Sequence, residues 1–333
     1  MPADHFEHSD LSKEEKAKLK DNLFYARNAR HARKLYLMLK RQHGGRQYGR
    51  THRRYMKGCL HDKMFPGAKV LPKPERNQKM QLHLNVEGAD PGDEPELVEI
   101  QDLSEETVLL DSITRMGSTV SNRKGNCRQN VGDEGDMFAF GQRATEPVAT
   151  TSGTTLKRNN KKKGRTTPNR NNPDLVYQLN RDNPNVATAI QMVAAETTRV
   201  MKIYAPKELE SIQEAERPKL LRCHPNVLSM MGGKDGPGTC IMFSRDLANA
   251  AHIDFKDNSR SFAIWVEEKP GVAQNWYFVL PDVSIDGSKG VLIPLFHGCA
   301  ISWNSRIIRH ATSRTHSGEG NHVYGCMFGS CRD

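Results

Sequence analysis

Two histidines and one aspartate are the residues of this sequence whose types and spacing best suit chemistry. His252 and Asp254 are separated by one residue, and His310 lies further along the chain after an apolar pair. In an extended strand, residues two apart project to the same face, so the first imidazole and the carboxylate can reach a common point. Two imidazoles and one carboxylate are the ligand set of non-haem Fe(II) oxygenases, which keep open positions for small ligands. The spacing therefore predicts a metal site at His252, Asp254 and His310.

The third ligand and the identity of the metal both have alternatives. His297 lies in a turn-like segment, whereas His310 follows Ile307 and Ile308 in a predicted strand, which favours His310. Zinc could use the same ligands, but no helix carries the general base of a metalloprotease motif. The His-x-Asp pair could also lie on the surface of an edge strand without a metal.

The C-terminal part of the chain predicts the strands that would position these side chains. Short apolar runs bounded by Gly, Pro, Asn and Asp follow one another without helical patterns between them. We expect strands at 239–244, 250–254, 261–267, 276–283, 291–296, 300–303, 307–310 and 323–328. This pattern favours an antiparallel sandwich or barrel such as a jelly roll. The expected fold class is α+β: a double-stranded β-helix (jelly-roll) core with flanking helices and a basic, partly disordered N-terminal half.

Helical patterns lie on the N-terminal side of these strands. Asn183 as N-cap and Pro184 at the first helical position begin an amphipathic helix that ends at Tyr204, before Pro206. Residues 11–42 contain neither Pro nor Gly and predict a long helix with a basic band. That band is either a solvated surface or an arm that contacts phosphates.

Charge is distributed unevenly, and this sets the predicted domain boundaries. Ten acids and no base lie between Glu87 and Asp111, which predicts a flexible acidic loop. Residues 157–165 hold six bases, a cluster that suits nuclear import or DNA contact as well as a solvated linker. We expect a basic helical arm over 1–60, a polar and largely flexible region over 61–171, and a helix plus jelly-roll domain over 172–333.

Composition limits the classes of protein to consider. The chain has 333 residues, a net charge of +10 and no apolar run of the ~18 residues that a membrane-spanning helix needs. Its first residues have no apolar core of a secretory signal. None of the seven cysteines forms a C-x-x-C pair, so we expect reduced thiols in the nucleus or cytosol. The basic balance suits a polyanionic partner such as DNA.

The order of the motifs resembles the Fe(II)-dependent dioxygenases of the TET/JBP group, and more closely their algal and protist branch, which modifies 5-methylcytosine. The likeness is carried by the His-x-Asp strand, then NWYFVLPDVS, then GVLIPLFHGCAISWNSRIIRHATS, over about residues 220–330. The first 170 residues have no part in it. The resemblance implies that His252, Asp254 and His310 hold Fe(II) as the catalytic residues, that O2 is the oxidant, and that Asp257 lines the co-substrate pocket.

The co-substrate is left open between 2-oxoglutarate and L-ascorbate. Most 2-oxoglutarate enzymes bind the distal carboxylate with Arg or Lys on the last core strand, whereas this strand reads HVYGCMF and has no base. Arg314 is a candidate substitute for co-substrate binding, and Arg260 or Lys256 could also reach inward. The algal branch is associated with L-ascorbate, which does not need that arginine.

Aromatic residues near the predicted pocket could stack on a base that is extruded from a duplex. The candidates are Trp265, Trp276, Tyr277 and Trp303. Aromatic residues in alternating strands usually belong to the core, and Trp303 is the one expected to lie near the site.

Three functions remain open from the sequence. The leading one is a nuclear Fe(II)-dependent dioxygenase that modifies 5-methylcytosine in DNA by oxidation of the methyl group or transfer to it. The second is a 2-oxoglutarate/Fe(II) hydroxylase of a protein or small molecule. The third is a non-catalytic DNA-binding protein with a degenerate jelly roll. The oligomeric state is not predicted.

Overall fold

The structure is a computed structural model that describes most of the C-terminal half of the chain and parts of the N-terminal half. The described residues are 68–76, 78–84, 96–121, 134–141, 184–220, 225–249, 251–254, 260–283, 285–288, 290–313, 315 and 320–328. The predicted helix over 11–42 and the basic cluster at 157–165 lie outside these residues, and both stay predictions. The division into three regions at residues 60 and 171 stays a prediction as well.

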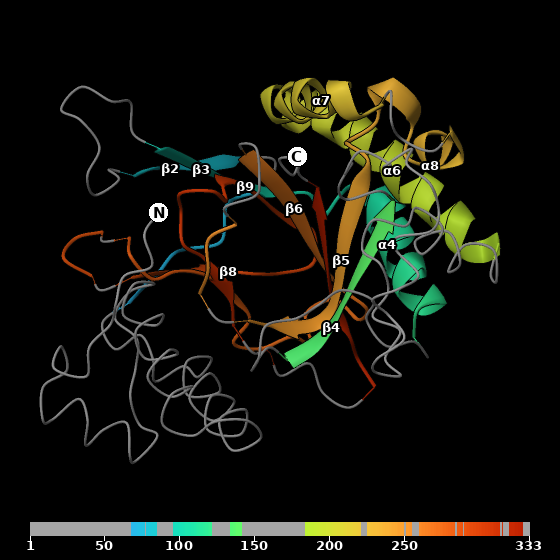
Figure 1. Ribbon diagram of the computed structural model, residues 1–333. Coiled ribbons are helices and arrows are strands. Elements are labelled where there is room, and N and C mark those ends of the chain that lie inside the picture. The colour runs from blue at the N-terminus through green and yellow to red at the C-terminus, as the bar shows by residue number, and fades with distance from the viewer. Residues whose placement is uncertain are drawn as a thin grey trace, which may run out of the picture.

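Among the described residues, the larger of two sheets (Figure 1) has seven strands, and all its pairings are antiparallel. The strand order is β2-β3-β9-β6-β11-β5-β4. The bounds of these strands are β2 (Lys79–Leu84), β3 (Glu96–Asp102), β4 (Glu134–Gly141), β5 (Cys240–Ala248), β6 (Arg260–Glu267), β9 (Cys299–Asn304) and β11 (Val323–Phe328). Side chains of β9 alternate between two cores: Ile301 and Trp303 belong to one core, and Ala300 belongs to the other.

The smaller sheet has four strands in the order β1-β8-β7-β10. Its strands are β1 (Lys69–Val70), β7 (Tyr277–Leu280), β8 (Val291–Pro294) and β10 (Ala311–Thr312). β1 runs parallel to β8, and the other pairings are antiparallel. Phe278 of β7 and Ile293 of β8 pack in the same apolar core as Trp265 and Trp303 of the larger sheet. The two sheets therefore enclose one core between them.

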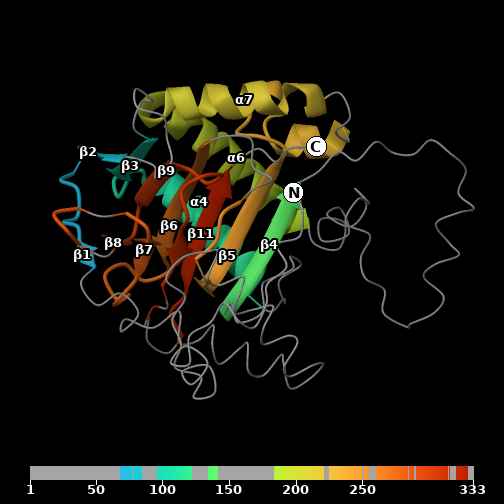
Figure 2. The same cartoon turned by 60° about the vertical axis from the view of Figure 1, so that its left-hand side comes forward.

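Helices cover the opposite face of the larger sheet (Figures 1 and 2). They are α4 (Thr107–Thr119), α6 (Pro184–Tyr204), α7 (Pro206–Leu220), α8 (Pro225–Met230) and the short 3₁₀ helix η4 (Gly233–Asp235). A second apolar core lies between them and the sheet. At Gly117 of α4, a Cβ atom would lie 2.4 Å from the buried ring of Tyr324 on β11. The glycine therefore allows this helix to approach the sheet closely.

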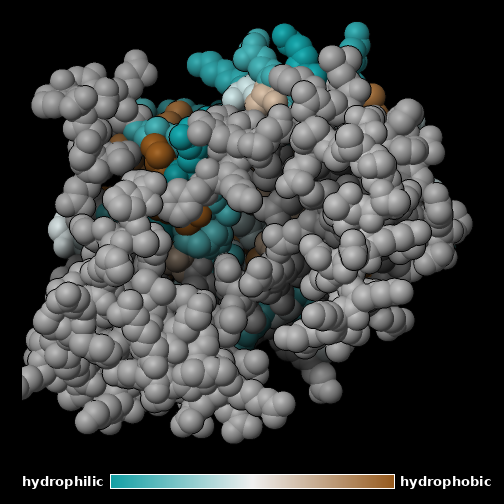
Figure 3. Space-filling view, in the orientation of Figure 1, coloured by the Kyte–Doolittle hydropathy of each residue, from teal (hydrophilic) through white to brown (hydrophobic). Residues whose placement is uncertain are grey.

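Helix α7 is amphipathic. Leu209 and Ile212 are buried in the helix-side core, whereas Lys207, Glu210 and Arg217 are exposed. The described surface at the top of Figure 3, where Figure 1 places α7, is accordingly hydrophilic. None of the described helices combines the length and the apolar character needed to cross a membrane.

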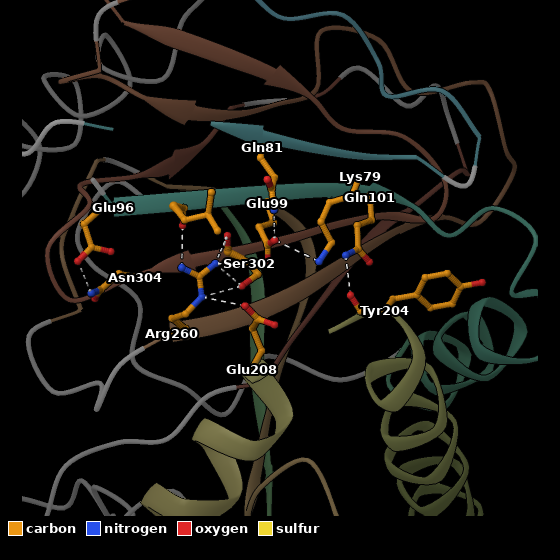
Figure 4. Close-up of polar contacts among 11 residues, drawn as sticks. Lys79, Gln81, Glu96, Glu99, Gln101, Tyr204, Glu208, Arg260, Ser302 and Asn304 are labelled. Carbon is orange, nitrogen blue, oxygen red and sulfur yellow. Dashed lines mark hydrogen bonds and ion pairs between the residues drawn. The ribbon is translucent and has the colours of Figure 1, made fainter. Parts of the chain in front are cut away.

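A buried polar cluster fastens β6 to its surroundings (Figure 4). The guanidinium of Arg260 donates to Glu208 Oε1 of α7 at 3.0 Å, to the Leu97 carbonyl of β3 at 2.8 Å and to Ser302 Oγ of β9 at 2.8 Å. Glu208 and Ser302 are both buried. Because Arg260 is the first residue of β6, these bonds fix the point where the chain enters this strand.

Glu99 of β3 is the second buried carboxylate of this cluster. It accepts a hydrogen bond from Gln81 at 2.8 Å and lies 3.1 Å from Lys79 Nζ and 3.8 Å from the Arg260 guanidinium. Burial by itself raises the pKa of Glu99, but the hydrogen bonds from Gln81 and Lys79 and the charge of Lys79 outweigh burial. The pKa of Glu99 is therefore lowered from its ordinary value of 4.5.

The expected fold class is confirmed at the level of a mixed α+β protein that is mostly β-sheet and resembles a jelly roll. The helix predicted from Asn183 to Tyr204 is confirmed as α6, and six of the eight predicted strands are present. The strand predicted at 250–254 is reduced to a bridge at His252. The strand predicted at 307–310 is wrong, because Ile307 and Ile308 lie in a turn and pairing begins only at His310.

The prediction of a flexible acidic loop from Glu87 to Asp111 is wrong for its second half. Residues 96–102 form β3 inside the larger sheet, and α4 begins at Thr107. Cations from other segments neutralise the acids: Lys73 lies 3.6 Å from Asp102, and Arg199 of α6 pairs with Glu106. Strands β2, β3 and β4 of the N-terminal half complete the larger sheet.

The lowered pKa of Glu99 predicts an acid-dependent loss of stability. The pairing stabilises the fold fully above about pH 4.5, and this contribution is lost as the pH falls below 4.5 through the folded-state pKa. At pH 7 we expect Glu99→Gln to lower the free energy of unfolding by roughly 1–3 kcal/mol. Urea denaturation should show this difference shrinking below pH 4.5. The exposed Glu75→Gln is the control, and a Glu99→Gln effect independent of pH would contradict the prediction.

Candidate metal centre

His252 and His310 lie directly opposite each other on two paired segments. The backbone N–H of His252 donates to the carbonyl of His310 at 2.9 Å, and the N–H of His310 donates back at 3.0 Å. A pair of residues that exchanges both bonds carries its side chains on the same face of the ladder. The ring centroids of the two imidazoles are accordingly 4.5 Å apart.

Asp254 reaches the same point from two residues further along. Its backbone N–H donates to the Ser305 carbonyl at 3.0 Å, which extends the pairing of the two segments. Its Oδ2 atom lies 3.7 Å from His252 Nε2 and 3.5 Å from His310 Nε2. One ligand atom from each of the three residues lies within 4.8 Å of the others, and no other such group occurs among the described residues. The structure thus brings the three predicted side chains together, and their roles as ligands and catalytic residues stay predictions.

The imidazole of His310 is held between aromatic rings. Its centroid lies 5.1 Å from the Trp303 ring in an edge-on contact and 5.5 Å from the Phe278 ring in a stacked one. Its Nδ1 atom lies 3.0 Å from the Ile308 carbonyl and 3.3 Å from Trp303 Nε1. When Nδ1 donates to Ile308, the Nε2 lone pair is available on the side of Asp254.

The centre is closed on one side and open on the other. The side chain of His310 is 6% exposed, whereas those of His252 and Asp254 are 27% and 25% exposed. Molecules from solvent can therefore approach the three ligand atoms from the side of His252 and Asp254.

The donor set fits a divalent transition metal, and it fits Fe(II) in particular. Two imidazole nitrogens and one carboxylate oxygen are the protein ligands of mononuclear non-haem iron sites. A backbone carbonyl beside the second nitrogen of a ligating histidine is the usual support for such a ligand, and Ile308 supplies it here. Catalytic zinc sites can also use three protein ligands of these types.

The residues predicted to bind the co-substrate are not brought to this centre by the described part of the chain. Asp257 and Arg314 lie outside the described residues, as does Lys256. Arg260 is described, but its guanidinium is turned toward β3, β9 and α7 (Figure 4). The expectation that Arg260 could reach inward is therefore wrong.

Other arginines of the core are paired with carboxylates. Arg245 of β5 pairs with Asp136 of β4, and the buried Arg309 pairs through two nitrogens with Asp282. Strand β11 carries no Lys or Arg. Arg245 and Arg309 are therefore not candidates for binding a co-substrate carboxylate.

His297 lies away from the three ligand residues. Its Nδ1 atom is 3.0 Å from the Glu267 carbonyl, and its backbone N–H donates to Glu267 Oε1 at 3.2 Å. Glu267 ends β6, whereas Asp254 precedes the start of that strand. The geometry therefore groups His310, and not His297, with His252 and Asp254.

The aromatic residues near the centre belong to the core. Trp303 contacts His310 as expected, but it is 1% exposed, and Trp265 and Trp276 are buried too. The core location that alternating strands favour for such residues is confirmed for these three. Phe278 was missed, although the alternation of β7 could have placed it on the inner face two residues after Trp276. The Ile308 carbonyl is a backbone group for which the sequence carries no signal.

Comparisons with known proteins do not establish the family of this chain. No protein-family model matches it, and no curated protein matches it either. Among solved structures, one titled "NgTET1 in complex with 5mC DNA" has a TM-score of 0.39 at 12% identity, over 80% of this chain and 83% of that chain. A 2OG-Fe(II) oxygenase family protein from Burkholderia pseudomallei has a TM-score of 0.21 at 16% identity, over 28% and 47%. Both TM-scores are too low for either likeness to support a conclusion about this chain.

The geometry predicts that His252 is needed for metal binding. Protein purified without oxygen should bind about one Fe(II) per chain, and His252→Ala should weaken Fe(II) binding by more than about 100-fold, because a direct ligand is lost. His297→Ala is the matched control, since it removes a half-buried imidazole of the same region and should leave metal content unchanged. Equal metal binding by the wild-type protein and His252→Ala would contradict the assignment.

Proposed function

We propose that this chain is an Fe(II)-dependent dioxygenase that modifies 5-methylcytosine in DNA, by oxidation of the methyl group or transfer to it. The observation that carries the proposal is the convergence of His252, Asp254 and His310 on two paired segments. Bound Fe(II) would supply the activation of dioxygen, together with an oxidisable co-substrate. The protein's own residues hold the metal, close one side of it and leave the other side to the substrate.

The sheet topology supports a double-stranded β-helix as the framework of this site. Eight consecutive segments are divided between the two sheets: β5, β6, β9 and β11 lie in the larger one. β7, β8 and β10 lie in the smaller one, and the segment at His252 pairs with His310, the residue directly before β10. The larger sheet has these strands in the order β9-β6-β11-β5, so strands distant in sequence are neighbours. Such crossing between two sheets is the arrangement of a jelly roll.

Each ligand residue would have a distinct task in binding the metal. His252 and Asp254 follow β5 and are half-buried, so the substrate would approach along their side. His310 is enclosed by Phe278 and Trp303, which keep water from that side of the centre. The methyl group of the substrate would then be presented to the open side, where Asp254 also lies.

The proposed co-substrate is 2-oxoglutarate or L-ascorbate. Binding of 2-oxoglutarate calls for a cation near its distal carboxylate. The described arginines Arg245, Arg260 and Arg309 are each paired with a carboxylate, so Arg314 is the proposed residue for this role, with Asp257 lining the pocket. L-ascorbate does not present a distal carboxylate and needs no such arginine.

DNA is the proposed substrate because of charge. The net charge of +10 suits a polyanion, and the basic segments at 11–57 and 157–165 could neutralise phosphates. An enzyme that acts on a base in a duplex must extrude it and hold the backbone. We place the protein in the nucleus on the same grounds.

The proposal is tested by incubating methylated and unmethylated duplexes with the protein, Fe(II) and either 2-oxoglutarate or L-ascorbate. Mass spectrometry of the nucleosides should show loss of 5-methylcytosine and a new modified nucleoside with at least one co-substrate. Asp254→Ala is the control for metal-dependent turnover and should give no product. Unchanged 5-methylcytosine with both co-substrates would contradict a DNA substrate. Consumption of co-substrate in the presence of a protein or small molecule would then favour the second function.

A further inference from the structure

The Nδ1 atom of His310 has two neighbours that cannot both bond to it. Trp303 Nε1 lies 3.3 Å away and can only donate a hydrogen bond, whereas the Ile308 carbonyl lies 3.0 Å away and can only accept one. A neutral imidazole carries one proton. Nδ1 therefore donates to Ile308 when it is protonated and accepts from Trp303 when it is not.

The choice between these two bonds decides the state of the other ring nitrogen. His310 Nε2 faces Asp254 Oδ2 at 3.5 Å. If Nδ1 accepts from Trp303, Nε2 carries the proton and directs it toward the Asp254 carboxylate. This tautomer is favourable in the protein without metal, because the Nε2 proton faces a negative charge. If Nδ1 donates to Ile308, the lone pair of Nε2 is available to a metal.

We propose that Trp303 is a positioning residue that favours the metal-free tautomer of His310, so that metal binding moves the hydrogen bond of His310 Nδ1 from the Trp303 indole to the Ile308 carbonyl. This inference rests on the metal site of the proposed function. It adds a residue that acts on the metal through His310 without touching the metal.

Burial makes this exchange costly. Trp303 is 1% exposed and His310 is 5% exposed, so water has little access to the indole N–H once its acceptor is withdrawn. Within the described part of the chain, His310 Nδ1 is the acceptor found for this N–H. A buried donor without an acceptor costs free energy, so the unsatisfied indole N–H destabilises the metal-bound state. The indole of Trp303 therefore lowers the metal affinity below what the three ligands alone would give.

The inference predicts that removing the indole N–H strengthens metal binding. In an anaerobic titration with Co(II), Trp303→Phe should bind the metal more tightly than the wild-type protein. The expected gain is about five- to tenfold, the size of one buried hydrogen bond. A merely structural role for Trp303 would give the opposite result, because a loosened site binds metal more weakly.

Trp265→Phe is the matched control. Trp265 packs in the same core, with its ring 6.4 Å from that of Trp303, and the same loss of ring volume there leaves His310 Nδ1 untouched. Its metal affinity should equal that of the wild-type protein. Metal binding by Trp303→Phe that is equal to or weaker than wild type would overturn the inference.

A measurement on the wild-type protein keeps the inference testable if Trp303→Phe fails to fold. Nitrogen NMR of ¹⁵N-histidine-labelled protein should show the Nε2–H tautomer of His310 without metal and the Nδ1–H tautomer with Zn(II). An Nδ1–H tautomer in the metal-free protein would overturn the inference while leaving the metal site intact. Absence of any metal binding by the wild-type protein would overturn the proposed function itself.

Discussion

Two backbone hydrogen bonds between His252 and His310 are the constraint on which the candidate centre depends. They set two imidazoles on the same face of a ladder, although the residues lie far apart in the chain. The bond from the Asp254 N–H to the Ser305 carbonyl then adds a carboxylate to that face. The convergence of three ligand atoms thus follows from strand pairing alone, and no long-range electrostatic attraction is needed to explain it.

The remainder of the fold keeps these paired segments in place. The segment that carries His252 and Asp254 leaves β5 and leads toward β6, whose first residue, Arg260, is bonded to β3, β9 and α7. The segment that carries His310 leaves β9, whose Trp303 packs against the His310 ring. The first segment thus connects two strands of the larger sheet, whereas the second connects β9 of the larger sheet to β10 of the smaller one. The larger sheet is backed by the helix-side core.

Residue types and spacing predicted the part of this arrangement that depends on local pattern. The i, i+2 relation of His252 and Asp254, the helix from Pro184 to Tyr204 and most strands of the C-terminal region can be predicted because each depends on neighbouring residues. The apolar pair Ile307 and Ile308 predicts a strand before His310. In the structure the two residues lie in a turn, where Ile308 is buried and Ile307 is exposed. Strand β3 could not be predicted because of its acids: the cations paired with Glu99 and Asp102, Lys79 and Lys73, come from other segments. The contact of Phe278 with the His310 ring arises from the packing of β7 against this segment.

The central claim is that the side chains of His252, Asp254 and His310 share one metal ion. Anomalous diffraction from crystals of the Fe(II)-loaded protein, kept without oxygen, tests it most directly. The account predicts one iron position per chain, bonded to Nε2 of His252, Nε2 of His310 and a carboxylate oxygen of Asp254. Iron bound elsewhere, or a site that leaves His310 uncoordinated, would contradict it.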